Sequence, residues 1–217
     1  MEPHPAERHG AWSRSATGFL LLALAPGFLN DLAFMRVGTV AEWLAADYAS
    51  KILPLAIVLW HPDLRGAVSK AMKPPTSWWT AGAWMIGAVA LALASTVLLK
   101  PWIADAFPRT ELFFYPMIES GWLRAVDLTF GLGLTAVVEE ILYRALVPGL
   151  LAAFGWRPWP IVVASAFAFG LIHWSHGIAS VADAVVAGVL LMIVVRRTGS
   201  LLPAIGAHYA INLVLFA

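Results

Sequence analysis

The chain has 217 residues, of which 60% are hydrophobic and 12% are charged, and its formal net charge is +1. A soluble domain carries about 25% charged residues, so this composition indicates an integral membrane protein. The near-neutral charge gives no indication of a nucleic-acid-binding surface, and we expect no nucleic-acid partner. The lack of cysteine excludes disulfides, thiol catalysis and cysteine metal ligands. We therefore predict an all-α fold, a polytopic membrane helical bundle formed as a single domain by residues 1–217.

About seven apolar stretches are interpreted as transmembrane helices, and six to eight would suit the chain length. These stretches are residues 16–29, 40–60, 78–99, 127–151, 159–174, 178–195 and 201–217. Prolines at positions 74, 75, 101, 108, 158 and 203 fall between these stretches or at their ends, where helix breakers are expected.

The first stretch has an alternative interpretation as a signal peptide, because Ala23-Leu24-Ala25 resembles a cleavage site. Pro26 follows directly and would hinder cleavage there. Since further apolar stretches follow in any case, we interpret residues 16–29 as the first membrane helix.

The distribution of lysine and arginine predicts the orientation of the chain in the membrane. With the N-terminus inside, the inner segments hold Arg8, Arg14, Arg65, Lys70, Lys73, Arg157, Arg196 and Arg197, and the outer segments hold Arg36, Lys100, Arg109 and Arg124. The excess of positive charge favours a cytoplasmic N-terminus and an outer C-terminus.

The fourth stretch, residues 127–151, carries three charged side chains: Glu139, Glu140 and Arg144. An ionisable residue inside a span costs at least about 2.5–3.5 kcal/mol and is a candidate functional residue. Glu140 and Arg144 are spaced i, i+4 and can form an ion pair on one helix face. Glu139 lies about 100° away around the helix. We expect it to be separate from Glu140 and to face a polar cavity.

Two other stretches carry complementary polar groups. Phe169 and His173 lie on the fifth, and His208 and Asn212 lie one turn apart on the seventh. The glutamates and His173 lie roughly 21 Å from the inner ends of their helices, and the pair on the seventh roughly 11–17 Å. This agreement in depth predicts one buried polar site built from three helices.

These groups suit hydrolysis by an activated water. A buried carboxylate such as Glu139 beside His173 can hold and deprotonate a water molecule. His208 and the amide of Asn212 can donate hydrogen bonds to a developing oxyanion. Attack on a peptide carbonyl inside the membrane would be intramembrane proteolysis.

The three motifs together resemble those of a known family. Glu139, Glu140 and Arg144 match EExxxR, Phe169 and His173 match FxxxH, and His208 and Asn212 match HxxxN. Over residues 125–217, the chain is similar to the CPBP family of CAAX prenyl endopeptidases and bacteriocin-processing proteins, also called the ABI family. Residues 1–120 show no resemblance beyond being membrane helices.

The resemblance implies a glutamic-type intramembrane endopeptidase whose catalytic core is residues 125–217. In this family pattern Glu139 activates the water with His173, and His208 and Asn212 stabilise the oxyanion. Glu140 and Arg144 organise the site. No cofactor is expected. The mechanistic alternative is a divalent metal such as zinc held by Glu139, His173 and His208, which are chemically suitable ligands.

The resemblance also implies a partner and a location. We expect a membrane-anchored protein or peptide substrate, with a C-terminal sorting signal or a lipid, processed in a bacterial cell membrane. Two alternatives belong to other functional classes. One is a catalytically idle scaffold or immunity protein of the same family. The other is a small proton-coupled transporter, which inverted repeats would favour and this sequence lacks.

Overall fold

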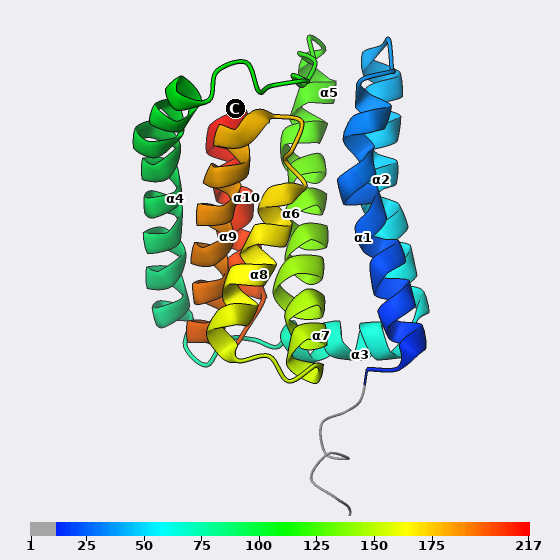
Figure 1. Ribbon diagram of the computed structural model, residues 1–217, viewed down its shortest axis with the longest axis vertical. Helices are drawn as coiled ribbons and strands as arrows, with labels where there is room; N and C mark the ends of the chain where they lie inside the picture. Colours follow the sequence, from blue (N-terminus) through cyan, green and yellow to red (C-terminus); the bar gives the residue numbers. More distant parts are fainter. Residues whose placement is uncertain (1–11) are drawn as a thin grey trace, which may run out of the picture.

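The fold is all-α, as the composition and the apolar stretches predict (Figure 1). The computed structural model describes residues 12–217. Arg8, which contributes to the predicted orientation, lies outside the described residues. The helical elements in chain order are α1 (Arg14–Phe34), α2 (Val40–Trp60), α3 (Pro62–Ala71), α4 (Trp78–Ala106), α5 (Gly121–Val126), η2 (Asp127–Gly131), α6 (Leu132–Glu140), η3 (Ile141–Leu146), α7 (Val147–Ala153), α8 (Pro158–Leu171), α9 (Gly177–Thr198) and α10 (Leu202–Phe216).

Two helices contain a proline and extend beyond their predicted ends. Pro26 lies within α1, which continues beyond the predicted end at residue 29, and Pro101 lies within α4, which continues beyond residue 99. Proline is tolerated inside membrane helices because neighbouring groups and local adjustments compensate for its missing hydrogen bond. The predicted placement of Pro101 between helices was therefore wrong.

Within residues 12–217, four helices are long and apolar enough to cross a membrane: α1, α2, α4 and α9. The apolar helices α8 and α10 are shorter, at 14 and 15 residues. At about 1.5 Å per residue they fall short of a hydrocarbon core of about 30 Å. The predicted number of about seven crossings therefore stays a prediction.

The elements from α5 to α7 follow one another along a single rod (Figure 1). Two segments of this rod, η2 and η3, are π-helical, and η3 begins directly after Glu140. A π-helical segment leaves a backbone carbonyl without its usual helical partner. Here the hydroxyl of Ser165 on α8 donates a hydrogen bond to the carbonyl of Tyr143, so a neighbouring helix compensates for this irregularity.

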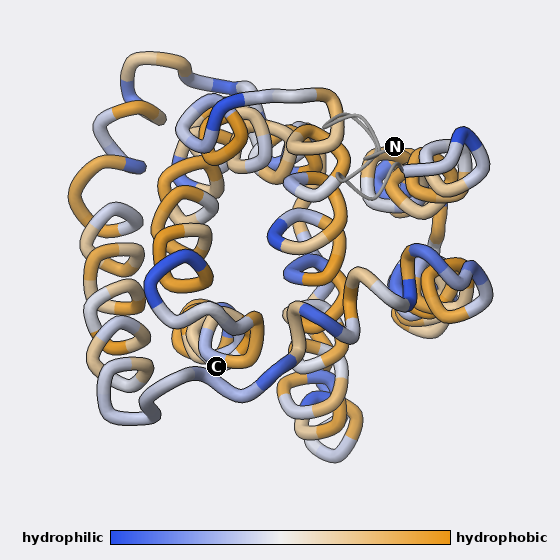
Figure 2. Tube along the Cα trace, turned by 90° about the horizontal axis from the view of Figure 1, so that it is seen from below, coloured by the Kyte–Doolittle hydropathy of each residue, from blue (hydrophilic) through white to orange (hydrophobic). Residues whose placement is uncertain are grey.

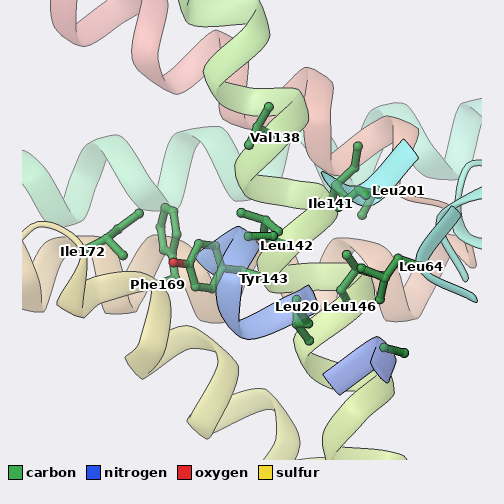
Figure 3. Packing of buried hydrophobic residues seen from close by; sticks show 13 residues of the cluster. Leu20, Leu64, Val138, Ile141, Leu142, Tyr143, Leu146, Phe169, Ile172 and Leu201 are labelled. Carbon is green, nitrogen blue, oxygen red and sulfur yellow. The ribbon is translucent and has the colours of Figure 1, made fainter. Parts of the chain in front are cut away.

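The short helix α3 was not predicted, and it lies across one end of the bundle (Figure 1). Leu64 of α3 is fully buried and belongs to a core cluster with Leu20, Leu146 and Leu201 (Figure 3). The backbone N–H of Leu201 donates to the carbonyl of Ala71 at 2.9 Å. These contacts anchor α3 between the start of α10 and the η3 segment.

Helices α1 and α2 form a pair at one side of the other helices (Figure 2). Their outward side chains include Leu21 and Ile52, which are 59% and 53% exposed. Exposed apolar side chains on a span are suited to contact with lipid. α1 begins at the end of the bundle where α3 lies, and α10 ends at the opposite end (Figure 1). Which end faces the cytoplasm stays a prediction.

Candidate active site

Glu140 and Arg144 form the buried ion pair that their i, i+4 spacing predicts. The Nε atom of Arg144 lies 3.2 Å from Oε2 of Glu140, and their side chains are 1% and 0% exposed. The guanidinium carbon of Arg144 also lies 4.1 Å from the centre of the Phe169 ring, a cation–π contact. Arg144 thus balances the charge of Glu140 on α6 and also packs against α8 through Phe169.

His208 on α10 contacts both glutamates. Its Nδ1 lies 2.8 Å from Oε1 of Glu140, and its Nε2 lies 3.5 Å from Oε2 of Glu139. The shorter contact is a hydrogen bond from Nδ1–H to the carboxylate, and the longer one is at the limit for a hydrogen bond. The imidazole thus joins α10 to the carboxyl end of α6.

This arrangement corrects the expectation that Glu139 is separate from Glu140. The angle between two residues on a helix describes their own directions, but a side chain from another helix can lie between them. The two nitrogens of His208 face different carboxylates, so both glutamates share one partner. They still differ in accessibility, because the side chain of Glu139 is 19% exposed and that of Glu140 is 0% exposed.

His173 follows the end of α8, and its ring orientation is defined locally. Nδ1 lies 3.2 Å from the carbonyl oxygen of Phe169. Because a carbonyl can only accept, Nδ1 carries the proton and Nε2 is left as the acceptor. The Phe169 ring packs against both histidines, with its centroid 5.2 Å from that of His173 and 5.7 Å from that of His208.

Two predicted members of the site, His173 and Asn212, make no hydrogen bond to the glutamates among the described residues. Within residues 12–217, no hydrogen bond or ion pair joins Glu139 to His173. Asn212 lies one turn beyond His208 on α10 and is half-buried. Its side chain makes no hydrogen bond to the described part of the chain. The structure therefore joins Glu139, Glu140, Arg144 and His208 directly, with His173 nearby across the Phe169 ring.

The alternative metal site can be tested by the positions of its ligands. Among the described residues, no group of three or more His, Cys, Asp or Glu side chains is arranged to hold a metal ion. Glu139, His173 and His208 therefore do not form the ligand set that the zinc alternative requires, although their chemistry would suit it.

Several polar contacts between helices were not predicted from the sequence. Asp183 of α9 accepts hydrogen bonds from Ser95 at 2.9 Å and Thr96 at 2.8 Å, both on α4. Asp31 of α1 accepts one from Ser175. Each is a carboxylate inside a predicted membrane helix or close to its end, which is the signal that could have identified it. Its partner, on another helix or turn, could not be read from the sequence.

An apolar groove is formed by η2, α6 and α10. Its volume is about 480 Å³, and its lining is almost entirely apolar. The lining residues are Thr129, Phe130, Gly133, Leu134, Val137, Ile205, Gly206 and Tyr209. Val137 precedes Glu139 by two residues on α6, and Tyr209 follows His208 on α10. The helices that position the polar groups therefore also form the groove.

Comparison with known families gives a match for the second half of the chain. Residues 121–214 match the sequence model of a family described as type II CAAX prenyl endopeptidase Rce1-like. Comparisons with curated proteins and with solved structures found no match. The matched segment contains the three motifs and runs from α5 into α10. The match over residues 121–214 confirms the family resemblance that the three motifs predict.

Proposed function

We propose that the protein is an intramembrane endopeptidase that hydrolyses a peptide bond near the C-terminus of a membrane-anchored, prenylated protein or peptide. The observation that carries this proposal is the contact of His208 with both Glu139 and Glu140, beside the buried Arg144. Such a cluster is energetically costly inside an apolar bundle, and ionisable residues are usually kept there for a function. It lies in a segment that matches the model of an endopeptidase family.

The partly exposed carboxylate of Glu139 is the base in this proposal. A water molecule lies between it and Nε2 of His173, the nitrogen left as an acceptor by the bond to Phe169. Glu139 takes a proton from the water, and the oxygen attacks the peptide carbonyl carbon. The C–N bond then breaks, and the proton passes from Glu139 to the leaving amine.

The negative charge that develops on the carbonyl oxygen needs hydrogen-bond donors. His208 and the amide of Asn212, one turn apart on α10, supply them in this proposal. Arg144 neutralises Glu140, and Glu140 in turn holds His208 through its Nδ1. The ion pair therefore acts on the reaction by keeping His208 in place.

The groove between α6 and α10 supports a lipid-bearing substrate. Members of the Rce1-like family act on membrane-anchored prenylated proteins. A prenyl chain is apolar and flexible, and it fits an apolar groove formed by α6 and α10, the helices that carry Glu139 and His208. The chain would then hold the C-terminal peptide across the polar cluster.

The proposal is tested with the purified protein in lipid vesicles and a fluorogenic C-terminal peptide, prenylated or unprenylated. We expect cleavage of the prenylated peptide. Glu139→Gln and His173→Ala should each lower kcat by about 10²–10⁴-fold, the usual contribution of acid–base catalysis. Asp183→Asn is the matched control, because it alters an intramembrane carboxylate that bonds α4 to α9 and is not part of the cluster.

Three outcomes would contradict the proposal or a part of it. Full activity of Glu139→Gln would exclude the carboxylate as the base. A lack of cleavage by the unsubstituted protein, with any of several prenylated peptides, would favour the idle scaffold instead. Equal cleavage of prenylated and unprenylated peptides would remove the assignment of the groove to the prenyl chain.

A further inference from the structure

The turn that carries His173 is held from α1, a helix outside the family match. The indole N–H of Trp174 donates to the carbonyl of Phe28 at 3.2 Å. The hydroxyl of Ser175 donates to Oδ2 of Asp31 at 2.5 Å. Asp31 is 2% exposed and Ser175 is 0% exposed, so water does not compete for this bond. The two residues that follow His173 are thus both bonded to one helix.

Helix α1 also packs against the residues around this turn at Gly27. A Cβ atom at Gly27 would lie 3.6 Å from Cγ2 of Ile172 and 3.6 Å from the hydroxyl of Tyr143. Gly27, Phe28 and Asp31 therefore form one face of α1 that packs on the residues flanking His173.

The segment between α4 and α5 holds the same turn from another side. The N–H of Leu112 donates to the carbonyl of Ser175 at 2.7 Å, and the N–H of Ile178 donates to Oγ1 of Thr110 at 3.1 Å. Ser175 is thus bonded through both its side chain and its carbonyl. This leaves the turn little freedom to shift while Asp31 is in place.

We propose that Asp31 is a positioning residue that fixes the imidazole of His173 through Ser175, an inference that rests on the proposed function. Ser175 and His173 belong to the same short turn of the backbone. The N–H of His176, the residue after Ser175, donates to the carbonyl of His173 at 3.1 Å and closes this turn. A short O–H···O bond to a carboxylate is among the stronger hydrogen bonds in proteins. Loss of this bond displaces the turn and with it Nε2 of His173.

The test compares Asp31→Ala, Asp31→Asn, Ser175→Ala and the double variant Asp31→Ala/Ser175→Ala in the vesicle assay. Asp31→Ala and Ser175→Ala should each lower kcat by about 10–100-fold, because small displacements of a reacting group have effects of this size. KM should change by less than about twofold, because the groove is not altered. The double variant should be no slower than the single ones, since both remove the same bond.

Asp31→Asn distinguishes positioning from general destabilisation. Its amide oxygen can still accept from Ser175, so it should retain most of the kcat that Asp31→Ala loses. The control Asp183→Ala removes two interhelical hydrogen bonds elsewhere and should leave kcat unchanged. Additive losses in the double variant, or an equal loss of kcat in Asp183→Ala, would overturn the inference. Full activity of Glu139→Gln would instead overturn the proposed function, so the two failures are distinguishable.

Discussion

Arg144 shows how a buried charge depends on few partners. Its Nη1 and Nη2 atoms are buried and make no hydrogen bond to any residue between 12 and 217. Its partners are therefore the carboxylate of Glu140 and the face of Phe169. Removal of one member of a buried ion pair leaves an uncompensated charge, which costs more than the pair itself contributes.

We predict that Arg144→Met destabilises the protein by about 3–5 kcal/mol, because Glu140 then remains buried without its cation. Thermal unfolding in detergent measures this as a lower Tm. The double variant Glu140→Gln/Arg144→Met should recover part of the loss, because neither charge is then left alone. A Tm for Arg144→Met equal to that of the unsubstituted protein would show that the pair is not important for stability.

At this scale the sequence predicted the ion pair, because i, i+4 spacing fixes which side chains meet on one helix. It did not predict that His208 contacts both glutamates. That contact depends on where α10 crosses α6, which is decided by the packing of the whole bundle. The roles of Glu139, His173, His208 and Asn212 stay predictions.

The elements α8 and α9 pack closely because both carry glycine at their contact. A Cβ atom at Gly170 would lie 2.9 Å from the carbonyl oxygen of Val181, and one at Gly188 would lie 3.1 Å from Cβ of Ala166. A backbone carbonyl cannot rotate away as a flexible side chain can. Gly170 precedes His173 by three residues, so the spacing of these two helices also bears on the site.

We predict that Gly170→Ala destabilises the protein by about 1–3 kcal/mol, because it forces α8 away from α9. It should also lower the cleavage rate, since His173 follows α8. Gly87→Ala in α4 is the matched control. A Cβ there has nothing within 4 Å, and alanine favours a helix over glycine by about 0.5–1 kcal/mol. If both variants have the same Tm, the close packing of α8 on α9 does not determine the stability of the protein.

Most elements could be predicted, but some could not. The second apolar stretch, 40–60, has the bounds of α2, and the others match their helices with shifts at the ends. The π-helical segments were missed because they do not change the apolar composition from which spans are identified. Helix α3 was missed because it is short and mixed in polarity, and its position depends on the buried contact of Leu64.

At the scale of the whole molecule, the alternation of helices places positive charge at one end of the bundle. Arg14 lies at the start of α1, and Arg196 and Arg197 lie in the last turn of α9. Helix α3, which carries Arg65 and Lys70, lies across the same end (Figure 1). These residues were all assigned to the inner segments from the sequence, and the structure places them at the same end of the bundle.

We predict that this end faces the cytoplasm, because positively charged loops are retained inside. The chain has no cysteine, so single variants can be labelled without a background. In intact cells, a membrane-impermeant maleimide should label Glu119→Cys and should label Lys73→Cys only after permeabilisation. Both positions are exposed. The reverse pattern would invert the orientation.

The bond between Asp31 and Ser175 also affects how halves of related proteins could be exchanged. Residue 31 lies outside the matched segment, and residue 175 lies within it. A chimera that joined residues 121–214 to the N-terminal helices of another relative would preserve every motif. If Asp31 positions His173 as proposed, the chimera would be fully active only if the new helix brought a hydrogen-bond acceptor to the place of Asp31. The unit of exchange in this protein is therefore larger than the segment that identifies its family.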